Sequence, residues 1–314
     1  MTSQASVSFR TGTSRTAEMI LGWPDQFVAT LKPRLLAVHA NSALSIDDLN
    51  ELNSYGLINA ATGRPTPVAN TLIDLLVREE WQDRDEFAPM LRESTGETVG
   101  ISVLEIGCST GRKLRTLGLP FVHTRVGVDV DASAVALGCR LARAENQPVV
   151  FSCCSGHSLP FSSDSFDVVV CRNALTYMHQ TTVLEEIGRV LRPNGTLFLR
   201  YENTLFDLQR LLRPRGVKTF LVHARNFMAG LTLAATGKQI SPERQRGGRA
   251  FASLGRLGKS LGRAECEIVR VEASQNCPRF LGRSTQTSIV AKKVGVAQSQ
   301  THRLRIPSPL LMAY

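Results

Sequence analysis

The chain has 314 residues, of which 43% are hydrophobic and 20% are charged. This composition is ordinary for a folded protein and excludes wholesale disorder, while near-average glycine and proline contents exclude collagen-like and low-complexity architecture. No stretch reaches the roughly 18 uninterrupted apolar residues of a membrane span, and the first residues lack the apolar core of a secretory signal. The seven cysteines form no C-x-x-C pair, which favours reduced thiols and predicts a cytoplasmic protein without a metal site.

The positive charge is concentrated in one part of the chain. The net charge is +10, and residues 204–263 contain 12 Lys/Arg opposed only by Asp207 and Glu243. This segment therefore accounts for the whole excess, and the rest of the chain is balanced. A run of this kind predicts either a solvated basic face or a surface that receives an anionic partner.

The N-terminal third has a helical pattern. Residues 1–15 are rich in Ser and Thr without periodicity, and we expect a flexible terminus there. Residues 16–95 predict a helical cap or dimerisation region, with one apolar stripe at Ile20, Phe27, Leu31 and Leu35. Ser45 caps a predicted helix at 46–55, and another begins near Pro67 after a turn that resembles a short wing. The 49–58 stretch contains no Lys or Arg, which argues against a DNA-reading helix.

Residues 96–294 alternate short apolar strands with helices. Two of the predicted helices are 132–145 and 182–191, the second with a capping box at Thr182 and Glu185. The alternation predicts a doubly wound, mostly parallel seven-stranded sheet, with the basic segment 204–263 as a lid insertion before strand six. We expect residues 295–314 to form a flexible tail. The expected strands are 103–106, 125–130, 149–152, 166–171, 196–201, 266–272 and 287–292.

The most informative stretch is VLEIGCSTGRKL at 103–114. A strand ending in Glu105 runs into the tight loop Gly107-Cys108-Ser109-Thr110-Gly111, and Asp129 ends the next strand. Such a loop lets the backbone approach a nucleotide at the carboxyl end of a first strand. A dinucleotide site needs a different glycine spacing, and a carboxylate at Glu105 would oppose its phosphates. The same carboxylate suits an ammonium and a sulfonium, which favours S-adenosylmethionine as the cofactor.

Four segments carry a family resemblance over about 100 residues: VLEIGCSTG, GVDVDASAV, HSLPFSSDSFDVVVCRNAL and LEEIGRVLRPNGTLFLR. They occur in the order and at the spacing of class I S-adenosylmethionine-dependent methyltransferases, specifically the type 11 methyltransferase domain. The resemblance implies a Rossmann-like fold with S-adenosylmethionine as cofactor. It places Glu105, Gly107 and Gly111 at the methionine end of the cofactor and Asp129 at its ribose.

The resemblance also implies roles at the adenine and beneath the methyl group. Val130 would lie against the adenine, and Asn173 and Ala174 would line the cofactor below the methyl. The family usually has an Asp where this chain has Ser155, and Ser109 also departs from the pattern. Adenine recognition is then either weaker or reassigned to backbone groups of Gly156 and His157. The full set of expected cofactor residues is Glu105, Gly107, Cys108, Ser109, Gly111, Asp129, Val130, Ser155, Gly156, His157, Asn173 and Ala174.

Methyl transfer is an in-line displacement at an activated sulfonium, so alignment supplies much of the acceleration. A base is needed only where the acceptor must lose a proton. Type 11 relatives often have a His-His pair where this chain has Thr176-Tyr177, and no single base stands out. The candidates for a base or an orienting group are Tyr177, His179, Tyr201 and His223.

For the acceptor we expect a small molecule or a glycoconjugate, methylated at oxygen and anionic, with Arg210, Arg213 and Arg225 receiving its charge. The interleaved leucines of 205–212 also suit an interfacial helix at a membrane surface. The sequence leaves open whether the protein forms a homodimer. An RNA or DNA methyltransferase is favoured by charge, but disfavoured by the Arg172-Asn173-Ala174 ending of strand four and by few aromatics. A non-catalytic binding protein is supported only by Ser109 and Ser155.

Overall fold

The computed structural model describes residues 6–9, 14–81, 87–96, 98–213, 216–239, 254–273 and 277–295, with only the backbone described at 6–9, 80, 81 and 87. The chain forms two compact units. Unit 1 is Met1–Glu97 with Cys108–Cys154, and unit 2 is Thr98–Gly107 with Ser155–Tyr314. The chain therefore passes from one unit to the other near the predicted boundary at residue 95, and again between Gly107 and Cys108, inside the predicted loop 107–111. Almost all of the predicted tail 295–314 lies outside the described residues.

Unit 1 contains three parallel strands in the order β1-β4-β3. The first of them lies within the segment expected to be flexible: Ser6 pairs with Val150 and Phe9 with Cys153, so this segment adds a strand to the edge of β4. The elements are β1 (Ser6–Phe9), α1 (Arg15–Leu21), α2 (Asp25–His39), α3 (Ile46–Ser54), α4 (Pro67–Trp81), α5 (Phe87–Thr95), α6 (Arg112–Arg115), β3 (Val122–Asp129), α7 (Ala132–Ala144) and β4 (Val149–Cys153).

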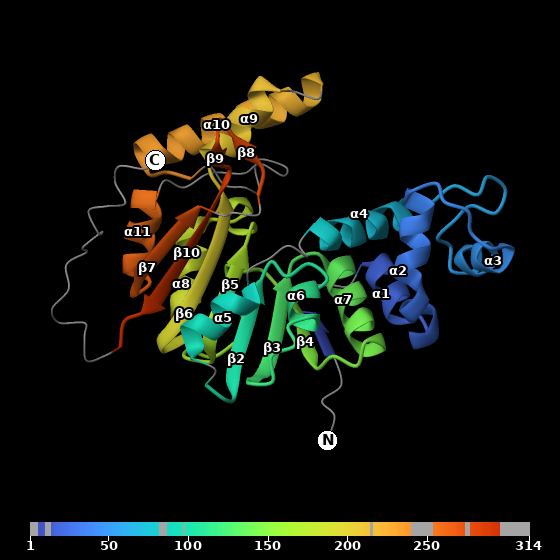
Figure 1. Cartoon of the computed structure of the whole chain (residues 1–314), viewed down its shortest axis with the longest axis horizontal. Coiled ribbons are helices and arrows are strands. Elements are labelled where there is room, and N and C mark those ends of the chain that lie inside the picture. Colours follow the sequence, from blue (N-terminus) through green and yellow to red (C-terminus); the bar gives the residue numbers. More distant parts are fainter. Residues whose placement is uncertain are drawn as a thin grey trace. The chain divides into compact units, whose positions relative to one another are not determined.

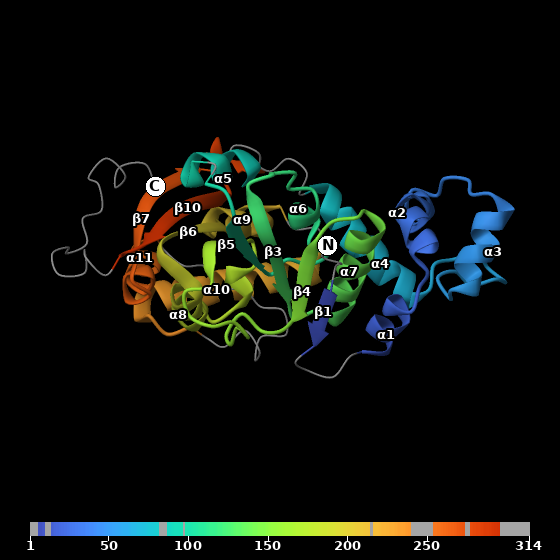
Figure 2. The same ribbon diagram turned by 90° about the horizontal axis from the view of Figure 1, so that it is seen from below.

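Helices α1 to α4 share one hydrophobic core with α7. All four residues of the predicted stripe are buried, and this core also includes Leu137 and Leu141 of α7. α1 and α2 both pack against α7, which in turn lies beside β4 and β1 (Figure 2). Ser45 caps α3 by accepting from the Asp48 N–H at 3.1 Å, as predicted. The helical region is thus built into unit 1 through α7, while its role in dimerisation stays a prediction.

Unit 2 contains strands in the order β2-β5-β6-β10-β7. β2, β5 and β6 are parallel, and β10 is antiparallel to both of its neighbours. All seven predicted strands are present as β2 to β7 and β10, so the predicted methyltransferase-like fold class is confirmed. The elements are β2 (Ile101–Ile106), β5 (Phe166–Arg172), η2 (Leu175–Tyr177), α8 (Gln180–Val190), β6 (Leu191–Glu202), α9 (Thr204–Leu212), α10 (Val217–Thr236), α11 (Leu254–Arg263), β7 (Cys266–Ala273), β8 (Arg279–Phe280), β9 (Arg283–Ser284) and β10 (Gln286–Lys293).

Two predicted boundaries in this unit were wrong. α8 begins at Gln180 with His179 as its N-cap residue, because the backbone of His179 is extended. The Thr182 hydroxyl lies 3.0 Å from the Nδ1 of His179 rather than forming the predicted cap. β6 begins at Leu191, five residues before the predicted start at Thr196.

The basic segment forms two kinds of structure. α9 and α10 lie side by side after β6 (Figure 1), whereas α11 packs against α8 and β7. Four of its arginines lie outside the described residues, namely Arg215, Arg244, Arg246 and Arg249. Within the described part of the chain, no helix is long and apolar enough to cross a membrane. All seven cysteines are free thiols, and six are buried while Cys277 is half-buried.

Candidate cofactor site and acceptor-side residues

In unit 1, a tight turn at residues 108–111 leads into α6. The Cys108 N–H donates to the Val128 carbonyl at 3.0 Å, and the Gly111 N–H donates to the Cys108 carbonyl at 2.8 Å. Gly111 has a φ of +66°, and a Cβ there would lie 2.4 Å from the ring of Phe151. Only glycine suits both the left-handed backbone and the contact with the ring. The predicted loop is therefore held closely against β3 and β4.

Asp129 ends β3 beside this loop. Its Oδ2 accepts from the Ser109 N–H at 2.8 Å and its Oδ1 accepts from the Asp131 N–H at 3.0 Å. Burial raises the pKa of the Asp129 carboxyl above its ordinary value, against the opposing effect of these N–H donors. The next residue, Val130, is 67% exposed. Asp129 thus lies at the strand end where the sequence places it, and Val130 is available for an apolar contact.

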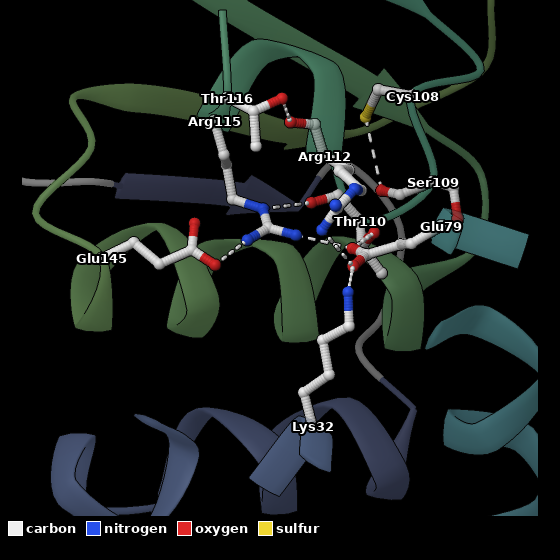
Figure 3. A network of polar contacts seen from close by, with 9 residues as sticks. All are labelled: Lys32, Glu79, Cys108, Ser109, Thr110, Arg112, Arg115, Thr116 and Glu145. Carbon is white, nitrogen blue, oxygen red and sulfur yellow. Dashed lines mark hydrogen bonds and ion pairs between the residues drawn. The ribbon is translucent and has the colours of Figure 1, made fainter. Parts of the chain in front are cut away.

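The cofactor loop is also contacted by a buried glutamate from α4 (Figure 3). Glu79 is 2% exposed, and its carboxylate accepts from the Thr110 hydroxyl and from an Arg115 nitrogen at 2.6 Å. The Lys32 ammonium of α2 lies 3.4 Å from the same carboxylate, and Arg112 lies 3.8 Å away. Arg115 also donates to the Thr110 carbonyl at 3.2 Å. Helices α2 and α4 are therefore linked by charge to the loop and to α6.

Glu79 was not among the predicted site residues. A signal was present, because Glu79 continues the spacing of Leu72, Leu75 and Leu76 on the buried face of α4. A carboxylate at such an apolar position requires a partner. The pattern cannot identify that partner, since Arg115 is 36 residues away in the chain.

In unit 2, Glu105 is 4% exposed near the end of β2 and is paired with Arg172 at the end of β5. The Arg172 Nε donates to the Glu105 carboxylate at 3.2 Å, and a second guanidinium nitrogen also donates to it. Burial lowers the pKa of Arg172 to about 9, and the nearby charge of Arg200 adds to this. The prediction assigned Glu105 to the positive charges of the cofactor alone. The structure adds Arg172 from the adjacent strand as a partner. Its position at the end of the apolar run VVVC was a signal that a charged side chain lies at this strand end.

Gly107 and Ala174 approach each other closely in the same unit. Gly107 has a φ of +72°, and a Cβ there would lie 2.3 Å from the Ala174 Cβ. The preceding Asn173 also has a positive φ, of 54°, and its N–H donates to the Arg200 carbonyl at 2.7 Å. The structure thus brings Gly107 close to Ala174, with Asn173 next to Ala174 in the chain and Glu105 near the end of β2, two residues before Gly107. The resemblance assigns all four of these residues to the cofactor.

The segment Ser155–His157 follows β4 in the chain. The Ser155 hydroxyl lies 2.8 Å from the Nδ1 of His157, whose Nε2 accepts from the His179 N–H at 2.9 Å. An accepting Nε2 places the proton on Nδ1, so His157 is neutral here and donates to Ser155. Ser155 and His157 therefore anchor this loop to the start of α8. Whether they also contact the adenine stays a prediction.

Residues 104–199 match the protein-family model described as a methyltransferase domain. That segment is a class I S-adenosylmethionine-dependent methyltransferase domain. The chain is 31% identical over 99 residues to the uncharacterized methyltransferase YcgJ of Bacillus subtilis, which spans 31% of this chain and 39% of that protein. The chain is 33% identical over 124 residues to a ubiquinone/menaquinone biosynthesis C-methyltransferase of Nitrosospira multiformis, spanning 38% of this chain and 50% of that protein. The match thus covers half or less of either relative.

A solved structure of an S-adenosylmethionine-dependent methyltransferase from Methanosarcina mazei superposes with a TM-score of 0.48 at 20% identity. It covers 66% of this chain and 98% of that one. S-adenosylmethionine is the cofactor of the methyltransferase domain. The residues present suit this cofactor chemically. Glu105 and Arg172 offer a negative and a positive group, and Asp129 offers a carboxylate at a strand end.

The four candidate bases have different surroundings. Tyr177 is 48% exposed on η2, Tyr201 is buried on β6, and His179 is the N-cap of α8. His223 of α10 is hydrogen-bonded through Nδ1 to the fully buried carboxylate of Asp207 on α9. Asp207 was not predicted as a site residue, since the sequence analysis counted it only as an opposing charge.

The three arginines predicted to bind the acceptor stay a prediction, and none of them lines the cavity described below. Arg210 lies over the ring of Phe206 at 5.4 Å, and Arg213 and Arg225 are exposed. A cavity of about 120 Å³ lies instead between α8 and α11, near the end of α10. Its lining includes Arg256, Lys259 and Arg263, and none of the described residues that line it carries a carboxylate. The charge of the basic segment is thus presented to a cavity by α11.

Proposed function

We propose that this protein is an S-adenosylmethionine-dependent methyltransferase that methylates a hydroxyl oxygen of a small-molecule or glycoconjugate acceptor. The observation that carries the choice of oxygen is the buried hydrogen bond between His223 and Asp207. A hydroxyl must lose its proton during methylation, and a histidine oriented by a carboxylate is suited to accept it.

Each unit, considered by itself, contains groups whose chemistry suits part of the cofactor. Glu105 and Arg172 of unit 2 offer one negative and one positive group to an amino-acid end that carries an ammonium and a carboxylate. Asp129 of unit 1 offers a carboxylate to ribose hydroxyls. When bound, S-adenosylmethionine supplies a methyl group on a positively charged sulfur, so the protein need not activate the electrophile.

His223 would take the proton from the acceptor hydroxyl. Its Nδ1 is hydrogen-bonded to Asp207, which fixes the imidazole orientation and stabilises the positive charge that the ring gains. The His223 side chain keeps 11% of its surface exposed, so an acceptor can reach the ring. α9, which carries Asp207, follows the carboxyl end of β6, and ligands of open α/β sheets bind at that end of the strands.

The acceptor is proposed to be anionic because of the cavity between α8 and α11. The cavity is lined by Arg256, Lys259 and Arg263 of α11 and by Gln180 and Thr181 of α8. Guanidinium and ammonium groups bind phosphate and carboxylate groups by charge-assisted hydrogen bonds. A phosphate or carboxylate of the acceptor would fit this lining.

The base assignment is tested with His223→Gln and Asp207→Asn in a methylation assay against hydroxylated sugar phosphates and lipid-linked sugars. We expect kcat to fall by about 10²- to 10⁴-fold in His223→Gln, the usual range for a general base. Affinity for S-adenosylhomocysteine should stay unchanged, and the matched control His179→Gln should keep its kcat. An unaltered kcat in both dyad variants would remove the base assignment.

A second candidate is methylation at carbon, which the printed name of the Nitrosospira multiformis relative describes for that protein. The same base would then deprotonate a phenol-like acceptor to make its carbon nucleophilic. Product analysis by NMR separates the two, since O-methyl and C-methyl groups have different carbon shifts. Cofactor binding without turnover of any acceptor would favour the non-catalytic alternative, and turnover of RNA or DNA would favour a nucleic-acid methyltransferase.

A further inference from the structure

Helix α10 presents apolar side chains to solvent on one face. Four of them have large exposed fractions: Val217 at 77%, Leu221 at 60%, Met228 at 59% and Leu231 at 45%. Their spacing of four, seven and three residues places them along one side of a helix. These four residues are called the α10 stripe.

The opposite face of α10 is packed into the protein. Its buried residues are His223, Asn226, Ala229, Gly230 and Leu233. α10 is therefore anchored through one face while the α10 stripe remains uncovered within the described part of the chain. Contiguous exposed apolar surface of this kind usually marks an interaction site.

The charges around the α10 stripe have one sign. Lys218 and Arg225 are exposed on α10 at positions adjacent to the stripe, and Arg213 is exposed just before it. α10 contains no Asp or Glu, and the only acidic residue of α9, Asp207, is buried. Apolar side chains flanked by exposed cations are complementary to an anionic lipid surface, where the apolar groups enter the interface and the cations meet the headgroups.

We propose that the α10 stripe docks the protein onto an anionic membrane surface. The sequence pattern favoured α9 for this role, but Leu205, Leu208 and Leu211 are half-buried, and only Leu212 is strongly exposed, at 64%. The surface belongs to α10 instead. Docking would bring the protein to a lipid-linked acceptor, but it depends on neither cofactor binding nor catalysis.

The test is flotation of the purified full-length protein with vesicles of phosphatidylcholine, with and without phosphatidylglycerol. We expect binding only to the vesicles that contain phosphatidylglycerol. The double variant Leu221→Asp/Met228→Asp should lose this binding. Val269→Asp is the matched control, because Val269 is 58% exposed on β7, and it should bind like the wild type. Thermal unfolding of each variant should match the wild type, since the altered side chains are exposed.

Lys218→Gln/Arg225→Gln should weaken vesicle binding about 30-fold, from about 1 kcal/mol per cation near an anionic surface. His223→Gln should bind vesicles like the wild type, so loss of the proposed catalysis and loss of docking are separable. The proposal is overturned if the wild type ignores anionic vesicles or if the Asp variants bind them equally well. It is also overturned if sedimentation shows that the α10 stripe holds two copies of the chain together and vesicles are not bound.

Discussion

Glu79 and Glu105 are both buried glutamates that pair with an arginine, but they stand at different kinds of position. Glu79 lies on a helix and is contacted by groups from α2, α6 and the cofactor loop. Glu105 lies at the carboxyl end of a strand and shares its carboxylate with Arg172, whose pKa is lowered to about 9. The first arrangement uses the carboxylate to join elements of unit 1. The second keeps opposite charges together at the strand end where ligands bind in this fold.

The difference between the two glutamates predicts its largest effect for Glu79→Ala, on the stability of the protein. Removing the carboxylate leaves the buried Arg115 guanidinium with the Thr110 carbonyl and the partly exposed carboxylate of Glu145, so we expect the free energy of unfolding to fall by about 3–5 kcal/mol. Urea denaturation measures the loss. Glu145→Ala is the matched control, because Glu145 also pairs with Arg115 but its side chain is 42% exposed, and it should cost about 1 kcal/mol or less. Equal losses in the two variants would contradict a joining role for Glu79.

A smaller effect is expected for Glu105→Gln, on cofactor affinity rather than on stability. The amide keeps the size of the side chain but loses the charge that attracts the cofactor ammonium. Calorimetry should show S-adenosylhomocysteine bound about ten- to 100-fold more weakly, the loss of one charged hydrogen bond. Glu79→Gln should change this affinity far less. The reverse order of affinities would mean that Glu79, not Glu105, governs cofactor binding.

The smallest effect is a pH dependence from Asp129. Its pKa is raised above the ordinary value of 3.8, chiefly by burial. Ionisation of Asp129 therefore opposes folding, and this penalty grows as pH rises through the folded pKa. Ribose binding needs the ionised form, so affinity for S-adenosylhomocysteine should decline on acidification at a pH above 3.8. Calorimetry at several pH values should show this decline in the wild type. Asp129→Asn should bind weakly at every pH, and a decline that persists in it would assign the titration elsewhere.

Local patterns predicted the strands and the cofactor loop because both depend on residues close in sequence. Glycine is required at 107 and 111 because a Cβ there would meet a neighbouring side chain. The Asp129 carboxylate at the end of β3 accepts a hydrogen bond from the same loop. The pairings were not predictable in this way. Apolar periodicity shows that Glu79 or Arg172 is buried, but not which side chain it meets 36 or 67 residues away.

The acceptor side was the least predictable part. Asp207 and His223 are 16 residues apart on two helices, and their meeting depends on how α9 packs against α10. The cavity residues Arg256, Lys259 and Arg263 are three of many cations in a uniformly basic segment. Composition alone cannot distinguish those that face a cavity from those that face solvent.

The distribution of the cysteines makes the protein suitable for site-specific labelling. Burial raises the pKa of the Cys171 and Cys266 thiols to about 12, so at neutral pH almost none of either is the reactive thiolate. Cys277 is the one thiol that is not buried. It is adjacent in sequence to β8, which contacts α9. A maleimide fluorophore would attach there without any cysteine being replaced, and its emission would report when an acceptor arrives beside Asp207.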